Sequence, residues 1–214
     1  MLDVRLVLAA VDAPLADAWQ RFCGDLDFVT VHRGSVLDLE VDAVVSPANS
    51  FGFMDGGIDA AYLERFGAEI QLRVRRQIYE HHAGELLVGA ADVVETGDAH
   101  IPYLIAAPTM RVPMVLRESV NAYLAARAVF VLLERGVFSS GARAGQPIRE
   151  SVRSVAFPGL GTGVGRLGFT TCARQVRVAI DDILLQQYAM PRSWAEASER
   201  HQLLYTDRPV RLQY

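Results

Sequence analysis

The chain contains no lysine, since all 21 of its basic residues are arginines. This absence excludes every mechanism that needs a lysine amine: Schiff-base formation, a lysine nucleophile, and phosphate binding by the Walker A lysine. A genome-wide codon bias is the simplest cause, and the exclusion holds whatever the cause.

Cysteine is almost as scarce, because only Cys23 and Cys172 occur among 214 residues. Two cysteines make no disulfide framework, and we interpret each one as a buried free thiol rather than a disulfide partner or metal ligand. The five histidines have no metal-ligand spacing. We therefore expect neither a metal ion nor another cofactor.

Long apolar runs and an excess of positive charge are also missing. No run approaches the roughly 18 residues of a membrane span, and Leu6 to Val11 is interpreted as a first strand rather than a signal peptide. The formal net charge is −4, so we expect no dominant basic field and no nucleic-acid partner. The composition indicates a cytoplasmic enzyme or binding domain without a membrane partner.

Strand-like and helix-like stretches alternate along the chain. Hydrophobic patterning predicts strands at 4–10, 28–31, 43–48, 86–95, 103–107 and 152–157, and helices at 14–23, 58–66, 68–82, 119–135 and from 170 or 171 to about 188. This alternation is typical of an α/β fold. We predict one domain over residues 1–189, with a surface loop at 137–151, and a partly ordered tail over residues 190–214.

The first informative loop, residues 46–59, reads SPANSFGFMDGGID and joins a buried strand to a helix. Asn49 can donate and accept hydrogen bonds, as a pair of sugar hydroxyls requires. Asp59 is either a helix cap or first-turn acid, or a carboxylate that orients a water and takes its proton. Asp55 is either a turn residue or a second acid. An apolar cluster in the same loop either enters the core or covers a ligand: Phe51, Phe53 and Met54.

The second informative loop, residues 158–165, reads PGLGTGVG. Its glycines allow the backbone N–H groups to turn inward beside a helix N-terminus, which suits a phosphate or diphosphate. The alternative is a tight turn that needs glycine for its geometry alone. In a mainly parallel sheet both loops open on the same edge, where α/β proteins bind ligands.

Taken together, VDAVVSPANS (41–50), GGID (56–59) and FPGLGTGVG (157–165) resemble the macrodomain family, in particular a bacterial and phage-associated branch. The resemblance implies a three-layer α/β/α sandwich with a mixed, mainly parallel six-stranded sheet. It also implies ADP-ribose as the ligand and, as in many members, hydrolysis of ADP-ribose derivatives. A lysine-dependent branch of the family is excluded.

The resemblance also implies residue roles. Asn49 and Asp59 become the catalytic pair, with Asn49 on the distal ribose and Asp59 beside the diphosphate and the catalytic water. The implied ligand-binding residues are Ser35, Val36, Ala48, Asn49, Asp55, Gly56, Gly57, Ile58, Gly161, Thr162, Gly163, Val164 and Gly165. Three of these depart from the family pattern: Ser35 replaces an adenine-contacting aspartate, Gly165 a frequent aromatic residue, and Asp55 a frequent glycine.

These observations favour an ADP-ribose-binding hydrolase that acts on ADP-ribosylated protein or on a small ADP-ribose ester or phosphate. Two alternatives stay open. One is a non-catalytic ADP-ribose reader, and the other is an interaction or phage-derived assembly protein whose pocket has drifted.

Overall fold

A six-stranded sheet forms the centre of the protein in the computed structural model, which describes residues 3–47 and 49–210. The strands are β1 (Arg5–Ala10), β2 (Val29–Arg33), β3 (Ala43–Ser46), β4 (Asp92–Glu95), β5 (Tyr103–Ala106) and β6 (Ser154–Phe157). Their order is β2-β1-β6-β3-β5-β4, and every neighbouring pair is parallel except the antiparallel pair β4 and β5. The predicted mixed, mainly parallel sheet is confirmed.

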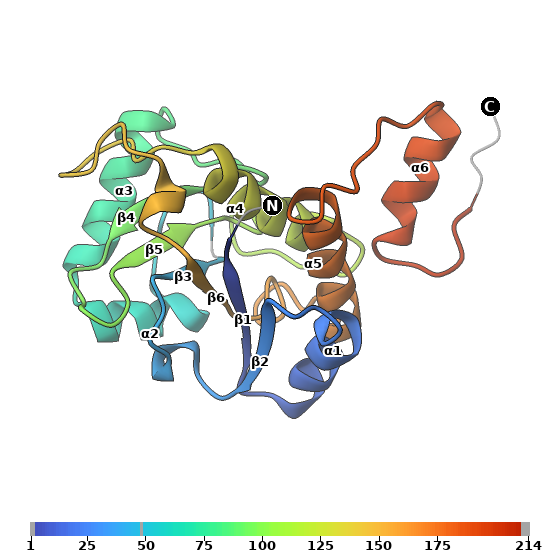
Figure 1. The fold of residues 1–214 in the computed structure, drawn as a ribbon, viewed down its shortest axis with the longest axis horizontal. Helices are drawn as coiled ribbons and strands as arrows, with labels where there is room; N and C mark the ends of the chain where they lie inside the picture. Colours follow the sequence, from blue (N-terminus) through green and yellow to red (C-terminus); the bar gives the residue numbers. More distant parts are fainter. Residues whose placement is uncertain (1–2, 48, 211–214) are drawn as a thin grey trace.

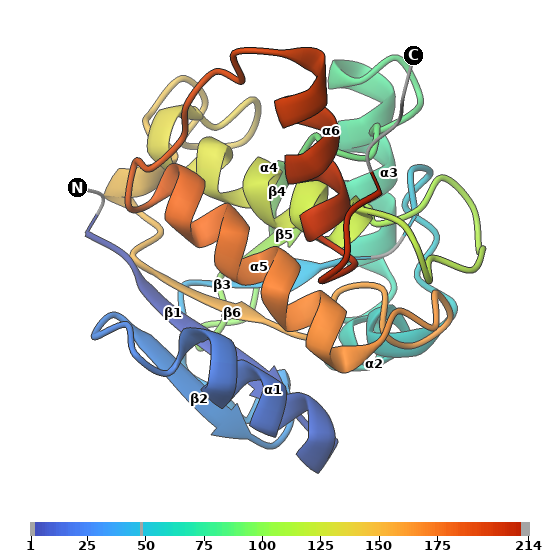
Figure 2. The same ribbon diagram turned by 90° about the vertical axis from the view of Figure 1, so that its right-hand side faces the viewer.

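Helices cover both faces of the sheet (Figures 1 and 2). They are α1 (Ala13–Cys23), α2 (Gly57–Phe66), α3 (Glu69–His81), α4 (Asn121–Arg135), α5 (Phe169–Ile183) and α6 (Trp194–Leu203), with 3-10 helices η1 (Val36–Asp38) and η2 (Ile148–Glu150). One buried apolar cluster joins the sheet to α1, α4 and α5, and a second joins it to α2 and α3. The result is the predicted three-layer α/β/α sandwich.

The central strands are buried on both faces, which explains their nearly continuous apolar sequences. Along β1, Leu6 and Leu8 belong to the first cluster, whereas Val7 and Ala9 belong to the second. Because successive side chains of a strand point to opposite faces, this one strand contributes to both core layers.

Several predicted boundaries move. The strand expected at 86–95 pairs only over β4, because Gly89 adopts a left-handed φ of +95° and turns the chain before it. Helix α4 begins at Asn121 rather than Ser119, although the Ser119 hydroxyl accepts a hydrogen bond from the Asn121 amide at 3.4 Å. Helix α5 runs from Phe169 to Ile183, so it begins one or two residues before the predicted start at 170 or 171 and ends before the predicted end near 188.

Two segments carry more structure than predicted. The loop at 137–151 contains η2 and buries Phe138 and Ile148, so it is not simply a surface loop. The C-terminal segment contains α6, which Figure 1 shows beside α5 at the outer side of the molecule. Among residues 3–47 and 49–210, no helix has the length and apolarity that crossing a bilayer requires. Both cysteines are buried free thiols, as predicted.

Candidate functional site

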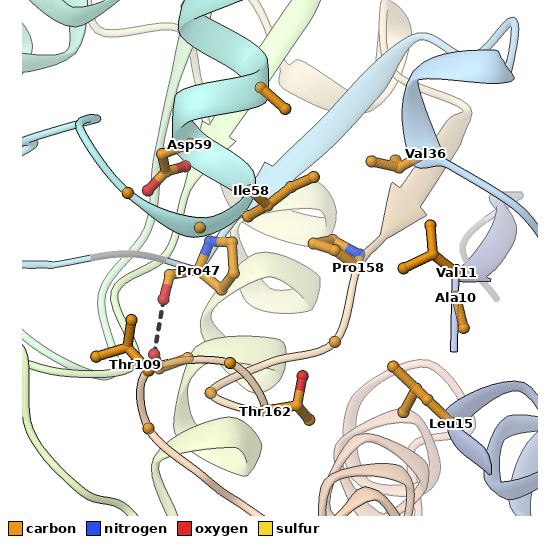
Figure 3. A pocket seen from close by; sticks show the side chains of 18 of the residues that line it. Ala10, Val11, Leu15, Val36, Pro47, Ile58, Asp59, Thr109, Pro158 and Thr162 are labelled. Atoms are coloured by element: carbon orange, nitrogen blue, oxygen red, sulfur yellow. Dashed lines mark hydrogen bonds between the residues drawn. The ribbon is translucent and has the colours of Figure 1, made fainter. Parts of the chain in front are cut away.

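A cavity of about 420 Å³ lies at the carboxyl ends of the parallel strands (Figure 3). This volume is within the usual range for small-molecule sites. Segments that follow β1, β2, β3, β5 and β6 line it. Because β3 and β6 are parallel neighbours, the two loops singled out from the sequence do open on the same edge of the sheet.

The cavity brings together nearly all of the predicted site residues. Those that line it are Ser35, Val36, Asn49, Asp55, Gly56, Gly57, Ile58, Asp59, Gly161, Thr162, Gly163, Val164 and Gly165. Ala48 lies outside the described residues. That these residues bind a ligand stays a prediction.

A third loop, following β5, was not singled out from the sequence. Thr109, Met110 and Pro113 line the cavity, and the Thr109 hydroxyl donates a hydrogen bond to the Pro47 carbonyl at 2.6 Å (Figure 3). This bond ties the third loop to the first. The sequence signal that could have identified this loop is its place directly after a predicted strand, because loops that follow parallel strands lie at the ligand-binding edge of the sheet.

Asp59 is a buried carboxyl group in the first turn of α2. Only 2% of the residue is exposed, and Oδ1 accepts a hydrogen bond from the Ser46 hydroxyl at 2.6 Å. Burial raises the pKa of this carboxyl from 3.8 to about 7, although the Ser46 hydrogen bond opposes the rise. Helix α2 has no side-chain cap, and Asp59 is the acidic residue of its first turn. Of the two structural alternatives, the first-turn acid is therefore confirmed and the cap is wrong.

The Asn49 side chain organises its own loop. Its Oδ1 accepts hydrogen bonds from the amides of Phe51 (3.1 Å) and Phe53 (3.3 Å), and its Nδ2 donates to the Phe53 carbonyl (2.8 Å). The amide nitrogen carries two hydrogens, so one of them has no partner among the described residues. Asn49 therefore offers a ligand one donor, while its acceptor oxygen is occupied twice.

Backbone amides supply most of the donors around the cavity. In the part of the chain that the structure describes, the amides of residues 161–165 and of Gly57, Ile58 and Asp59 donate to no protein atom. The second group lies at the N-terminus of α2, where the helix dipole favours negative charge. Consecutive unpaired amides at a loop and a helix start form an anion-binding surface.

The glycines of the second loop are required by space as well as by conformation. Gly161 has a φ of +68°, a region that side chains disfavour. A Cβ on Gly165 would lie 2.5 Å from the Gly161 carbonyl oxygen and 2.8 Å from a Leu116 methyl group. The geometry therefore leaves no room for a side chain at this position.

Charge around the cavity is entirely negative. Its charged lining residues are Asp12, Asp55 and Asp59, and none of the basic side chains that the structure describes lines it. Nor does any group of three or more His, Cys, Asp or Glu side chains suit a metal ion within residues 3–47 and 49–210. An anionic ligand would therefore depend on the backbone amides.

The apolar residues of the first loop divide between two roles. Met54 is buried in the core cluster beneath α2 and α3. Phe53 is 49% exposed, lines the cavity and lies under the Arg75 guanidinium at 4.2 Å. Phe51 is half-buried and contacts Arg111 in the same way at 5.2 Å. Met54 is thus a core residue, whereas Phe53 is exposed beside the cavity.

The fold and the site define an α/β/α sandwich whose cavity, walled by two glycine-rich loops, lies at the carboxyl edge of the sheet. The chain belongs to the Macro domain family, whose model matches residues 45–176. An uncharacterized protein of Aquifex aeolicus is 31% identical over 146 residues, which is 68% of this chain and 76% of that protein.

Solved structures show the same fold. The macrodomain of Mycobacterium tuberculosis DarG has a TM-score of 0.53 at 21% identity, covering 70% of this chain and 87% of its own. Thermosipho africanus DarTG in complex with ADP-ribose has a TM-score of 0.54 at 13% identity, covering 83% of this chain and 50% of its own.

Proposed function

We propose that this chain binds ADP-ribose and hydrolyses an ADP-ribose derivative, either ADP-ribosylated protein or a small ADP-ribose ester or phosphate. One observation carries the proposal: two groups of unpaired amides face one cavity that also contains a buried carboxyl group with a pKa of about 7. Family membership and the ADP-ribose complex of a structural relative support it.

In this proposal the diphosphate is bound by backbone. The amides of residues 161–165 wrap one side, and those of Gly57 and Ile58 at the start of α2 meet the other. Such amides are already oriented in the free protein, so binding requires little reorganisation of the loops. Asn49 holds the first loop in place and gives its remaining amide hydrogen to a hydroxyl of the distal ribose.

Asp59 is the proposed general base. As a carboxylate it accepts a proton from a water molecule whose oxygen bonds to the anomeric carbon of the distal ribose. The bond from that carbon to the leaving group breaks, and the leaving group takes up a proton from Asp59 or from solvent. A pKa near 7 matches a base that works at neutral pH, and such a base contributes about 10²–10⁴ in rate.

The test combines calorimetry with ADP-ribose and a turnover assay on an ADP-ribosylated protein. We expect Asp59→Asn to retain binding and to lower kcat about 10²- to 10⁴-fold. In the unmodified protein, kcat/KM should rise with pH and level off above about pH 7. If Asp59→Asn and Asn49→Ala both keep full hydrolysis, the assignment of these residues fails.

A non-catalytic reader is the second candidate, and the burial of Asp59 favours it. Its Oδ1 already accepts from Ser46, and little of the residue is exposed for contact with water. Binding of ADP-ribose without turnover of any derivative would support the reader. Absence of binding at millimolar ADP-ribose would reject both candidates in favour of an interaction or assembly protein with a drifted pocket.

A further inference from the structure

One charged residue at the mouth of the cavity has no role in the chemistry described so far. Asp55 lies in the first loop, two residues before α2, and it is exposed to solvent while also lining the cavity. A residue with both properties stands where the cavity opens. The leaving group of a protein substrate extends through this opening, because a cavity of about 420 Å³ holds the ligand and not the protein attached to it.

Asp55 belongs to the same end of the cavity as the proposed base. Figure 3 shows Asp59 at one end, with Ala10 and Val11 at the other. Only Gly56 separates Asp55 from α2, whose first turn carries Asp59. Both carboxyl groups therefore lie where the proposed function puts the anomeric carbon of the distal ribose and its leaving group.

The protein does not neutralise the Asp55 carboxylate. Two arginines contact the first loop, but Arg75 donates to the Phe51 carbonyl at 3.0 Å and Arg111 is paired with Glu85 at 2.6 Å. Within residues 3–47 and 49–210, the Asp55 carboxylate has no hydrogen-bond or ion-pair partner. Its negative charge is therefore available to a ligand.

This charge distinguishes the three kinds of leaving group that an ADP-ribose derivative carries. A phosphate group would add an anion beside Asp55, where none of the described basic side chains lines the cavity to offset the repulsion. A carboxylic ester is neutral and gains nothing from the carboxylate. The guanidinium of an ADP-ribosylated arginine is cationic, and its N–H groups can donate to both carboxylate oxygens.

Apolar side chains border the same opening. Phe53 is 49% exposed and Val164 is 57% exposed, and both line the cavity. Long cationic side chains lay their methylene groups along apolar surface while the charged head stays in a polar environment. An opening with apolar borders and one free carboxylate therefore matches an arginine side chain in both of its parts.

We propose that Asp55 is a specificity-determining residue that binds the guanidinium of arginine-linked ADP-ribose, and that the substrate class is protein ADP-ribosylated on arginine. The inference rests on the proposed function, because it assigns the leaving group of the same reaction. A water oxygen bonds to the anomeric carbon and gives one proton to Asp59. The carbon–nitrogen bond breaks, and its electron pair leaves with the nitrogen as neutral guanidine. The guanidine then takes up a proton from Asp59 or from solvent, which restores cationic arginine.

Three substrates of different charge test the assignment: two peptides of one sequence that carry ADP-ribose on an arginine or on a glutamate, and ADP-ribose phosphorylated at its distal anomeric oxygen. Asp55→Asn should raise KM for the arginine-linked peptide about tenfold, the value of one charge-assisted hydrogen bond at a partly exposed site. Its kcat should stay within about twofold, because the contact is made in the ground state and the transition state alike. KM should be nearly unchanged for the glutamate-linked peptide and lower for the phosphate.

Asp27→Asn is the matched control, since Asp27 is exposed in the α1–β2 connection and outside the cavity. It removes the same charge from the protein and should leave all three KM values unchanged. An increase in KM for the arginine-linked peptide as large as that of Asp55→Asn would show an effect of net charge and overturn the role of Asp55.

The outcomes separate this inference from the proposed function. If the protein hydrolyses either of the other substrates but not the arginine-linked peptide, or if Asp55→Asn changes KM equally for both peptides, the role of Asp55 is overturned and the hydrolysis of ADP-ribose derivatives stands. A protein that hydrolyses none of the three substrates overturns the proposed hydrolysis and the assignment of Asp55 with it.

Discussion

The Asp59 carboxyl is balanced between two protonation states by its surroundings. Burial favours the neutral acid, while the hydrogen bond donated by Ser46 favours the carboxylate. In the unfolded chain the same group ionises near pH 4. The native state therefore holds this proton over a pH interval in which the unfolded chain has already released it.

We predict that Asp59→Asn is more stable than the unmodified protein and that its advantage grows with pH. A raised native pKa stabilises the fold at low pH, and this stabilisation is lost as pH rises from about 4 through about 7. The amide cannot ionise and can still accept from Ser46. The difference in unfolding free energy should increase by about 2.5 kcal/mol between pH 5 and pH 8, measured by urea unfolding.

Asp55→Asn provides the control for this measurement. Asp55 lines the same cavity but is exposed, so removing its charge should change stability by less than about 0.5 kcal/mol at either pH. A constant difference between Asp59→Asn and the unmodified protein across this pH range would contradict the raised pKa of Asp59.

At the scale of elements, the second glycine-rich loop depends on contact with the third loop. The Leu116 amide donates to the Gly165 carbonyl at 2.7 Å, and the Leu116 side chain packs against both Gly161 and Gly165. The Leu167 amide also returns to the Gly161 carbonyl at 3.0 Å. These contacts use the carbonyl groups of Gly161 and Gly165 as acceptors, while the amides of residues 161–165 stay unpaired.

We predict that Gly165→Ala and Gly163→Ala differ sharply although they are two residues apart. A methyl group on Gly165 would overlap the Gly161 carbonyl, whereas one on Gly163 would meet nothing within 4 Å. Gly165→Ala should lower the unfolding free energy by about 1–3 kcal/mol, as overpacking does. Gly163→Ala should change it by less than about 0.5 kcal/mol. Urea unfolding measures both, and equal effects would contradict the close packing at Gly165.

The C-terminal segment is the element least connected to the cavity. Its contacts with α5 include an ion pair between Arg174 and Asp207 at 2.6 Å, a hydrogen bond from Gln175 to the Leu204 carbonyl, and the buried Leu204 side chain. Between Gly165 and residue 210, where the described part of the chain ends, no residue lines the cavity. We propose that residues 1–189 form the functional domain and residues 190–214 an appended segment.

We predict that a chain ending at residue 189 binds ADP-ribose within about twofold of the full chain but unfolds at a lower temperature. Exposing the Leu204 site should cost about 1.5–3 kcal/mol, and each kcal/mol lowers Tm by about 2–4 °C in a domain of this size. Calorimetry and thermal unfolding measure the two effects. Asp207→Asn in the full chain should lower Tm far less, because an exposed ion pair contributes little. If the shortened chain lost its affinity for ADP-ribose, residues 190–214 would contribute to the binding site and the prediction would be wrong.

At the scale of the whole molecule, the sequence alone predicted what depends on local pattern and on the rules of parallel sheets. The order of elements, the three layers and the shared edge of the two loops follow from apolar strands alternating with amphipathic helices. The particular strand order did not follow, because pairing partners lie far apart in the chain. The Thr109 contribution was missed for the same reason, since its contact with Pro47 is a tertiary one.

Side-chain environments in the site were the least predictable part. The sequence allowed Asp59 to be a helix cap, a first-turn acid or a base, and only the packing of β3 against α2 shows that it is buried and bonded to Ser46. Asn49 was expected to face a sugar, yet most of its hydrogen-bonding capacity is used by its own loop. The hydrogen-bond partners of Asp59 and Asn49 depend on which donors and acceptors lie next to them in the folded protein. Residue types alone do not specify these neighbours.

The strand that comes last in the chain lies in the middle of the sheet. Val155 of β6 pairs with Leu6 of β1 on one side and with Ala43 of β3 on the other. During synthesis, β1 and β3 therefore have no mutual contact to stabilise them until the ribosome has released residues 154–157. Pairings this distant in sequence slow folding. The cavity is lined by the loop that follows β6, so the site stays incomplete until that loop has been synthesised.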